Sequence, residues 1–354
     1  MAKYHYRGPD LGLFAAQAGG NLAGRFLYRQ ADQFGLLNPD GSKTYYSGSG
    51  LVWDDIAGHF TAGTITAISH YDSSGAYVDH LTGLSITITA LEPLLTAPAS
   101  GEAASALQAA LLSSNDRIWS NGGNDVLNGG AGQDIIDGGA GNDTLTGGTG
   151  PDILRGGDGR DTASYRTSTF GIAIDLKSGT GEGGDASGDT LRGIENVFGS
   201  HSADILDGDA RANVLVGLGG ADNLHGKGGN DKLIGSSGGD FLTGGNGVDV
   251  LIGGAGRDWI DGGTGEDIIF AGAGRDVIYG GPDWDIIVYD CSWDELKLRY
   301  DGSDYSIWAD APDGKDHVYA ALTFATNDGT YRYNVPTATW VYESDMTGAD
   351  WLHA

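Results

Sequence analysis

Residues 244–270 read GGNGVDVLI, GGAGRDWID and GGTGEDIIF, three consecutive blocks of nine residues with one internal order. The same frame runs outward from Gly199 to Val288, and it is found again from Ser120 to Ser164, which gives fifteen blocks. Asp stands at the sixth position of fourteen blocks, and Leu or Ile stands at the eighth position of fourteen. Two positions held in phase through so many copies indicate a repeat architecture in which each block is one structural unit.

Glycine stands mostly at the first, second and fourth positions of a block. Because glycine adopts φ > 0 without steric cost at Cβ, all three positions predict a tight six-residue turn, and the last three residues predict a short strand. Only the central side chain of such a strand points inward, so the eighth positions predict ladders inside two facing parallel sheets. The predicted ladder residues are Leu127, Ile136, Leu145 and Leu154, followed by the eighth positions from Leu206 through Ile287.

The pattern resembles GGxGxDxUx, the hemolysin-type (RTX) calcium-binding nonapeptide repeat, over residues 120–288. The resemblance implies an all-β fold, a parallel β-roll (a β-solenoid) in which two blocks form one coil and the turns bind calcium. It also implies a bacterial protein exported by a type I secretion system. The uncleaved export signal of this family lies at the C-terminus, here near residues 300–354.

Calcium is the expected cofactor for physical reasons as well. One buried Leu or Ile per block stabilises the fold by less than the conformational entropy of fixing nine residues costs. The blocks also carry 21 acidic and 7 basic residues, so a roll without cations repels itself. Calcium accepts mixed carboxylate and carbonyl shells, whereas magnesium demands octahedral geometry. We therefore expect disorder without calcium and folding when it binds.

Aspartates eighteen residues apart fall on the same edge of the predicted roll, where stacked turns can share an ion with the carbonyls of the glycine turns. One site per stacked pair of intact turns predicts about eight to ten calcium ions. The predicted carboxylate ligands are Asp125, Asp134, Asp143, Asp152, Asp161, Asp204, Asp222, Asp231, Asp240, Asp249, Asp258, Asp267, Asp276 and Asp285. The predicted turn glycines of these sites are Gly130, Gly132, Gly139, Gly141, Gly148, Gly150, Gly245, Gly247, Gly254, Gly256, Gly263 and Gly265.

The first two blocks of the second run, residues 199–216, depart from the pattern. Ser200, Ser202, Asp209 and Arg211 replace turn glycines, and Asn213 replaces the sixth-position aspartate. We expect calcium sites there to be weak or absent.

Three domains are predicted. Residues 1–115 show period-two apolar patterns and predict a small antiparallel β domain that ends in a helix near 102–112. Residues 116–288 are the roll, interrupted at 165–198 by a loop and a degenerate rung with Glu195 and Val197 at its sixth and eighth positions; a separate small domain is the alternative. Residues 289–354 are aromatic-rich and predict a β cap with a hairpin about 301–304, or alternatively a sugar-binding platform.

Charge excludes several classes of partner. Forty-eight Asp and Glu against 20 Lys and Arg give a formal net charge of -28, which disfavours nucleic acid and anionic membranes. No apolar run has the length of a membrane span or an N-terminal secretion signal, so we expect neither membrane insertion nor signal-peptide export. The single Cys291 excludes an intramolecular disulfide framework.

The sequence contains few motifs that indicate catalysis. The stretch 235–239 matches G-x-S-x-G but falls in phase as a roll turn, and HExxH does not occur. A His/Asp site at His70, Asp72 and His80 is the one constellation in residues 1–115.

We therefore expect a secreted calcium-binding protein without enzymatic activity. Its expected role is structural, at the bacterial cell surface or in the extracellular matrix, with head-to-tail self-association into filaments or a layer. The alternatives are an adhesin that binds cell-surface or matrix glycans, and a secreted enzyme or toxin with its site in residues 1–115.

Overall fold

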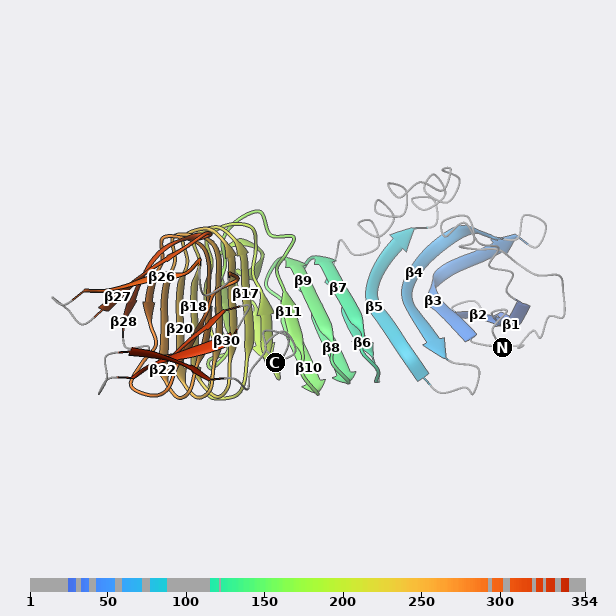
Figure 1. Ribbon diagram of the computed structural model, residues 1–354. Coiled ribbons are helices and arrows are strands. Elements are labelled where there is room, and N and C mark those ends of the chain that lie inside the picture. Colours follow the sequence, from blue (N-terminus) through green and yellow to red (C-terminus); the bar gives the residue numbers. More distant parts are fainter. Residues whose placement is uncertain are drawn as a thin grey trace. The chain divides into compact units, whose positions relative to one another are not determined.

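A computed structural model gives the structure of the protein (Figure 1). The chain forms two compact units, one of Met1–Asp161 with Gly188–Gly193 and one of Thr162–Ser187 with Ile194–Ala354. The structure describes residues 25–29, 33–37, 43–54, 59–71, 77–87, 115–120, 122–291, 295–301, 306–319, 323–326, 329–334 and 339–343.

The first unit begins with antiparallel strands. Each strand from β1 to β5 pairs in antiparallel order with the next strand along the chain. The turn signals at 38–41 and 72–75 fall between β2 and β3 and between β4 and β5. The helix predicted near 102–112 lies outside the described residues. The strands are β1 (Arg25–Arg29), β2 (Gln33–Leu37), β3 (Lys43–Asp54), β4 (His59–Tyr71), β5 (Tyr77–Thr87) and β6 (Arg117–Ser120).

From β6 onward the pairing in this unit becomes parallel, and each strand pairs with the strand two places along. One row is β6, β8 (Ile135–Ala140), β10 (Ile153–Asp158) and β14 (Thr190–Arg192). The other pairs β7 (Val126–Ala131) with β9 (Thr144–Thr149). The offset between paired residues is eighteen, as predicted for two blocks per coil, except between β10 and β14, where Ile153 pairs with Thr190.

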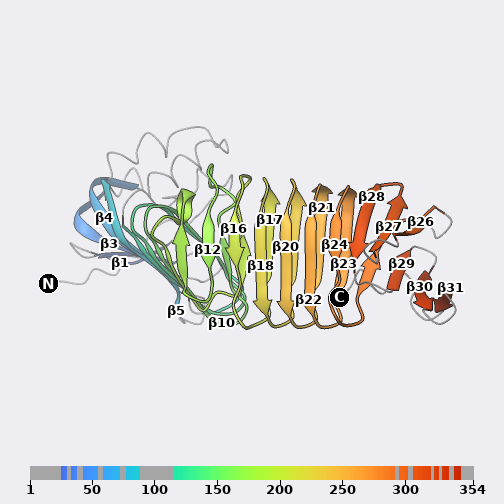
Figure 2. The same cartoon turned by 90° about the vertical axis from the view of Figure 1, so that its left-hand side faces the viewer.

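The second unit has the same parallel arrangement in two longer rows, whose successive strands Figure 2 shows side by side. The first row is β11 (Thr162–Ser164), β15 (Asn196–Phe198), β17 (Val214–Gly219), β19 (Lys232–Ser237), β21 (Val250–Gly256), β23 (Ile268–Gly274), β25 (Ile286–Val288) and β29 (Thr323–Thr326). The second is β12 (Ala173–Asp175), β16 (Ile205–Asp207), β18 (Asn223–Gly228), β20 (Phe241–Asn246), β22 (Trp259–Thr264), β24 (Val277–Tyr279) and β28 (Gly314–Tyr319).

The core consists of the predicted ladder. The eighth-position Leu and Ile side chains from Ile136 to Leu154 and from Leu206 to Ile287 are fully buried. Leu127, in the first block, is only half-buried. One inward side chain per short strand therefore forms a continuous but thin apolar core, as the repeat predicts.

The interruption at 165–198 contains three strands besides the degenerate rung, and one of them, β12 (Ala173–Asp175), lies where Ile172, Ile174 and Leu176 predict a strand. Val197 is buried on β15, as expected for the eighth position of a degenerate rung. Two further strands, β12 and β14, also pair in parallel with repeat strands, each in its own unit. The rest of the interruption forms β13 (Thr180–Glu182), antiparallel to β12, and the 3-10 turn η1 (Gly184–Ala186).

The parallel ladder also extends beyond residue 288, where the composition suggested that the roll ends. Strands β28 and β29 pair in parallel with β24 and β25, and Val318 is buried like a ladder residue. The predicted hairpin about 301–304 is confirmed as β26 (Lys297–Asp301) and β27 (Ser306–Ala311). Strands β30 (Gly329–Asn334) and β31 (Thr339–Glu343) follow β29 in antiparallel order.

The turn glycines divide into two kinds. All twelve predicted glycines at the second and fourth positions have positive φ, for example 135° at Gly247. The prediction was wrong for the first position, where Gly253 and its equivalents do not have positive φ. A Cβ on Gly253 would instead lie 2.5 Å from both Asp258 Oδ2 and the carbonyl oxygen of Ala271. The first glycine is therefore required by the close approach of oxygens and not by the backbone angle.

In three blocks the second position holds a residue other than glycine at positive φ. Ser236, with φ 80°, is the simplest of the three to test. We expect Ser236→Gly to stabilise the calcium-bound protein by about 0.5–1 kcal/mol, because relief of the left-handed conformation exceeds the added entropy of the unfolded chain. Its exposed neighbour Ser237 has no positive φ, so Ser237→Gly should destabilise by a similar amount. Thermal unfolding in excess calcium measures both; equal signs for the two variants would contradict the argument.

Candidate metal centre

The sixth-position aspartates form hydrogen-bonded columns along the edges of the sheets. In each column Oδ1 of one aspartate accepts the backbone N–H of the residue one coil earlier, at 2.7–3.0 Å, as in Asp231 N–H to Asp249 Oδ1. The columns of the second unit follow the two series expected from the eighteen-residue spacing, and the first unit contains shorter ones. Thirteen of the fourteen predicted ligands are almost completely buried, and Asp125 is half-buried.

The other carboxylate oxygen has no partner in the chain at most of these positions. In Asp249 and Asp267, Oδ2 is buried and accepts no hydrogen bond. A buried carboxylate oxygen without a donor is unfavourable, because it has lost its water and gained nothing in exchange. The arrangement therefore favours a bound cation, or a proton, beside each such oxygen. The same holds for Asp134, Asp143, Asp222, Asp240, Asp258 and Asp285.

The electrostatics agree with this reading. Burial, reinforced by neighbouring carboxylates, raises the pKa of Asp222 and of Asp267 to about 7, far above the ordinary value for aspartate. Burial likewise raises the pKa of Asp258 and of Asp285 to about 6. A bound cation would reverse the shift, because it stabilises the charged form.

The oxygens around these carboxylates fit calcium. A Cβ on Gly262 would lie 2.5 Å from Asp267 Oδ2 and 2.4 Å from the carbonyl oxygen of Gly280, so a carboxylate and a carbonyl from adjacent coils converge there. Among the described residues, no group of three or more His, Cys, Asp or Glu side chains could hold a metal. The sixth position supplies a carboxylate and the adjacent coil a carbonyl, a donor set suited to calcium and not to zinc. The calcium count stays a prediction.

Two positions in the second run differ. Asp204 is buried, but Ser200 donates to both of its oxygens, from Oγ to Oδ1 at 2.8 Å and from N–H to Oδ2 at 2.6 Å. Asn213 accepts the Asp209 N–H and donates to the Glu195 carbonyl. Both side chains are satisfied within the chain, which agrees with the weak sites expected in residues 199–216.

The columns include three buried aspartates that the repeat frame missed. Asp316 Oδ1 accepts the Asp276 N–H at 3.0 Å, and Asp189 Oδ1 accepts the Asp152 N–H at 2.8 Å. Asp116 lies at the start of a column and donates its N–H to Asp134. The separations of 40 and 37 residues hide the first two from a search in steps of nine. The signal was nevertheless present, because APDGKDHVY at 311–319 and GDASGDTLR at 184–192 keep the sixth-position aspartate and an apolar eighth residue.

Acidification should weaken calcium binding. Because burial raises the pKa of the column aspartates, the metal-free folded state binds more protons than the unfolded chain between about pH 4 and 7. That contribution to the stability of the metal-free fold is fully present at low pH and is lost as pH rises through 7. Calcium needs the ionised carboxylate, so its affinity should rise by up to about tenfold per pH unit and per titrating carboxylate between pH 5 and 7.

Isothermal titration in two buffers of different ionisation enthalpy measures this effect, because binding near pH 6 should release protons. Equal affinity at pH 5.5 and 7.5 with no proton release would contradict it.

The structure does not test the predicted catalytic site of His70, Asp72 and His80 as a whole. His70 lies on β4 and His80 on β5, two strands that pair, whereas Asp72 lies outside the described residues. The stretch 235–239 begins in the last three residues of β19 and continues into the link to β20, and Ser237 Oγ donates to the Leu218 carbonyl. Within the described part of the chain, none of the helices has the length and apolar character needed to cross a membrane.

Comparison with known proteins supports the repeat assignment. The model of the RTX calcium-binding nonapeptide repeat (4 copies) matches residues 112–145, 137–164, 198–233, 234–269 and 261–290. No curated protein matches. The extracellular lipase LipA from Serratia marcescens, a solved structure, aligns with 16% identity and a TM-score of 0.22, over 58% of this chain and 36% of the lipase chain. The chain thus spans little more than a third of that lipase, and a likeness of this size carries no argument about activity.

The repeat matches, the two-row parallel solenoid and the columns of buried aspartates agree with one another. Proteins with these repeats are calcium-binding and typically leave the cell by type I secretion. Residues 112–290 of the chain therefore carry RTX calcium-binding nonapeptide repeats.

Proposed function

We propose that this protein is exported unfolded where calcium is scarce and folds outside the cell when calcium binds the aspartate columns. The observation that carries the proposal is the set of buried Oδ2 atoms without a donor, because a fold with these groups is complete only with cations. Affinities on the order of 10⁻⁴–10⁻³ M, as in extracellular calcium modules, suit such a switch. Calcium supplies positive charge and oxygen coordination at each turn, and the chain's own residues hold the carboxylates in place.

We further propose a structural role without catalysis, at the cell surface or in the matrix. Among the described strands, β1 pairs only with β2, and β31 pairs only with β30, so each leaves one edge open. Open edges favour strand addition. An open edge at each end of the strand order favours head-to-tail contact between copies, which extends into filaments when it does not close.

Electron microscopy and sedimentation of the purified protein test the structural role. Regular polymers in millimolar calcium that dissolve in chelator are the expected result. Calcium-loaded protein that stays monomeric at all concentrations would remove the self-assembly part of the proposal and leave the folding part intact.

A second candidate role, glycan binding, is favoured by a row of aromatic rings on the second row of strands. Phe241 and Trp259 stack at 4.0 Å with an interplanar angle of 3°, and Tyr279 and Tyr319 stack at 4.6 Å with 6°. Trp259 and Tyr279 join the two pairs at 5.3 Å. These rings are partly exposed, and amphipathic rings of this kind suit contact with sugar. A glycan array with the wild type and Trp259→Ala tests it; no retained glycan in calcium excludes it.

A further inference from the structure

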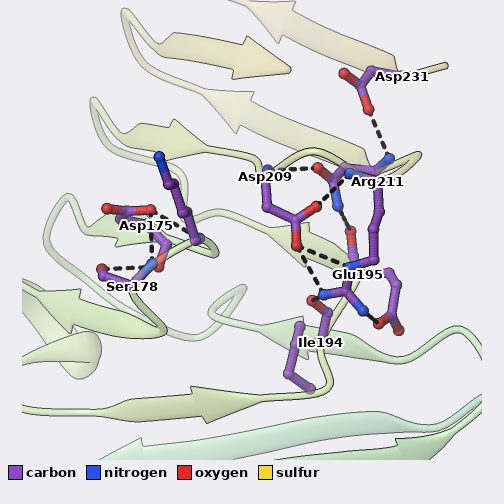
Figure 3. A network of polar contacts seen from close by, with 9 residues as sticks. Asp175, Ser178, Ile194, Glu195, Asp209, Arg211 and Asp231 are labelled. Atoms are coloured by element: carbon purple, nitrogen blue, oxygen red, sulfur yellow. Dashed lines mark hydrogen bonds and ion pairs between the residues drawn. The ribbon is translucent and has the colours of Figure 1, made fainter. Parts of the chain in front are cut away.

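The block 208–216 replaces a calcium turn by an ion pair built from the chain itself. It carries Asp209 at the second position, Arg211 at the fourth and Asn213 at the sixth. Figure 3 shows Arg211 reaching back from this turn toward Glu195, the sixth-position residue of the degenerate rung on β15.

The guanidinium of Arg211 is surrounded by the kind of oxygens that calcium would take. Nη1 lies 2.5 Å from Glu195 Oε1, and Nη2 lies 2.9 Å from Asp209 Oδ2. Nε donates to Asp209 Oδ2 at 2.9 Å, and Nη2 donates to the Ile194 carbonyl at 3.4 Å. Two carboxylates and a carbonyl thus share one cation, and the charge-assisted bonds to Asp209 are the stronger kind.

The two carboxylates are poorly exposed, so the ion pair is worth more than one on the surface. The exposed side-chain fractions are 11% for Glu195 and 13% for Asp209. Burial acts to raise the pKa of Asp209, but the hydrogen bonds and charge of Arg211 prevail and hold that pKa below its ordinary value. The column aspartates shift in the opposite direction. The Asp209 carboxylate is therefore already neutralised by the guanidinium of Arg211.

Asn213 completes the arrangement by removing a charge. Its Oδ1 accepts the Asp209 N–H at 2.8 Å, its Nδ2 donates to the Glu195 carbonyl at 2.9 Å, and its own N–H joins the Asp231 column at 2.7 Å. An aspartate here could not donate to Glu195. The neutral amide therefore suits a turn whose cation is a side chain.

We propose that Arg211 is the resident cation of a metal-free turn, and that this turn and the preceding one at 199–204, where Ser200 satisfies Asp204, form a coil that stays folded without calcium. The inference rests on the proposed calcium-driven folding of the other coils. A repeat protein can nucleate at any folded unit and propagate outward. This coil is the unit from which calcium-bound coils extend.

Hydrogen exchange of the full chain in excess chelator tests the proposal. Amides of 196–198 and 214–216 should exchange at least about tenfold more slowly than those of 250–252 and 268–270. Arg211→Gln should abolish the difference. Arg155→Gln is the matched control, because Arg155 forms only an exposed pair with Asp137 at 3.8 Å, and it should leave the difference unchanged.

The outcomes separate the two proposals. Uniformly fast exchange in the wild type overturns the resident cation and leaves calcium-driven folding intact, whereas uniform protection in chelator overturns calcium-driven folding itself.

A second variant tests the same site without depending on loss of folding. Asp209→Gly, Arg211→Gly and Asn213→Asp together restore the repeat pattern of the turn. The triple variant should bind one more calcium ion than the wild type by native mass spectrometry, and its 196–216 region should lose protection in chelator. An unchanged ion count together with retained protection would overturn the proposal.

Discussion

Removal of calcium from the purified protein should abolish most of its β-sheet circular dichroism, and re-addition should restore it. The reason lies in the columns, where at least eight buried carboxylates have an oxygen without a partner. Burying one uncompensated charge costs several kcal/mol even after relaxation. The total therefore exceeds the about 5–15 kcal/mol by which natural domains are stable, and protonation at neutral pH relieves only those groups whose pKa reaches about 7.

Circular dichroism and calorimetry with calcium, with chelator and with calcium restored measure this effect. Magnesium at the same concentration is the matched control, and it should restore little structure, because it resists exchanging its waters for irregular carbonyl shells. A chain that keeps its β signal and melting temperature after exhaustive chelation contradicts the proposed role of calcium in folding.

The regular part of this fold could be predicted from the sequence because the repeat fixes it locally. A block of nine sets the turn, the strand and the inward side chain at once, so the buried positions from Leu206 to Ile287 follow from counting. The eighteen-residue offset of the aspartate columns follows in the same way. Whether each column binds calcium, and how many ions it holds, stays a prediction.

The parts of the fold and of the site that could not be predicted depend on contacts between residues separated by interruptions of the nine-residue repeat. Asp316 joins its column across a 40-residue separation that includes the β26–β27 hairpin, and an insertion of this length takes the next block out of the nine-residue frame. The partnership of Arg211 with Glu195 is similar, because sequence alone marks both residues as departures and only the stacking of β15 on β17 brings them together.

The first-position glycines show another limit. The repeat pattern predicts positive φ at these glycines as at the other turn glycines, whereas Gly253 is needed for the space that Asp258 Oδ2 and a neighbouring carbonyl fill. A glycine in a motif does not reveal which of the two demands it meets.

A methyl group added at a fourth-position glycine should strongly destabilise the calcium-bound protein. Gly247, at the fourth position of its block, has φ 135°, and a Cβ there would lie 1.8 Å from the carbonyl oxygen of Gly229 one coil earlier. Gly247→Ala should destabilise the calcium-bound protein by about 2–5 kcal/mol, from the disfavoured φ together with the displacement of a packed backbone. The displaced turn carries a carbonyl of the predicted site, so the calcium midpoint for folding should rise in parallel.

Gly228→Ala is the matched control, because Gly228 lies in the preceding stacked turn but has no positive φ, and its nearest neighbour would be the Asn246 carbonyl oxygen at an ordinary 3.8 Å. That variant should be neutral or stabilised by up to about 1 kcal/mol, since alanine reduces the entropy of the unfolded chain. Calcium titrations followed by circular dichroism compare the two. If Gly247→Ala folds at the wild-type calcium concentration, carbonyl stacking between coils does not set the fourth-position requirement.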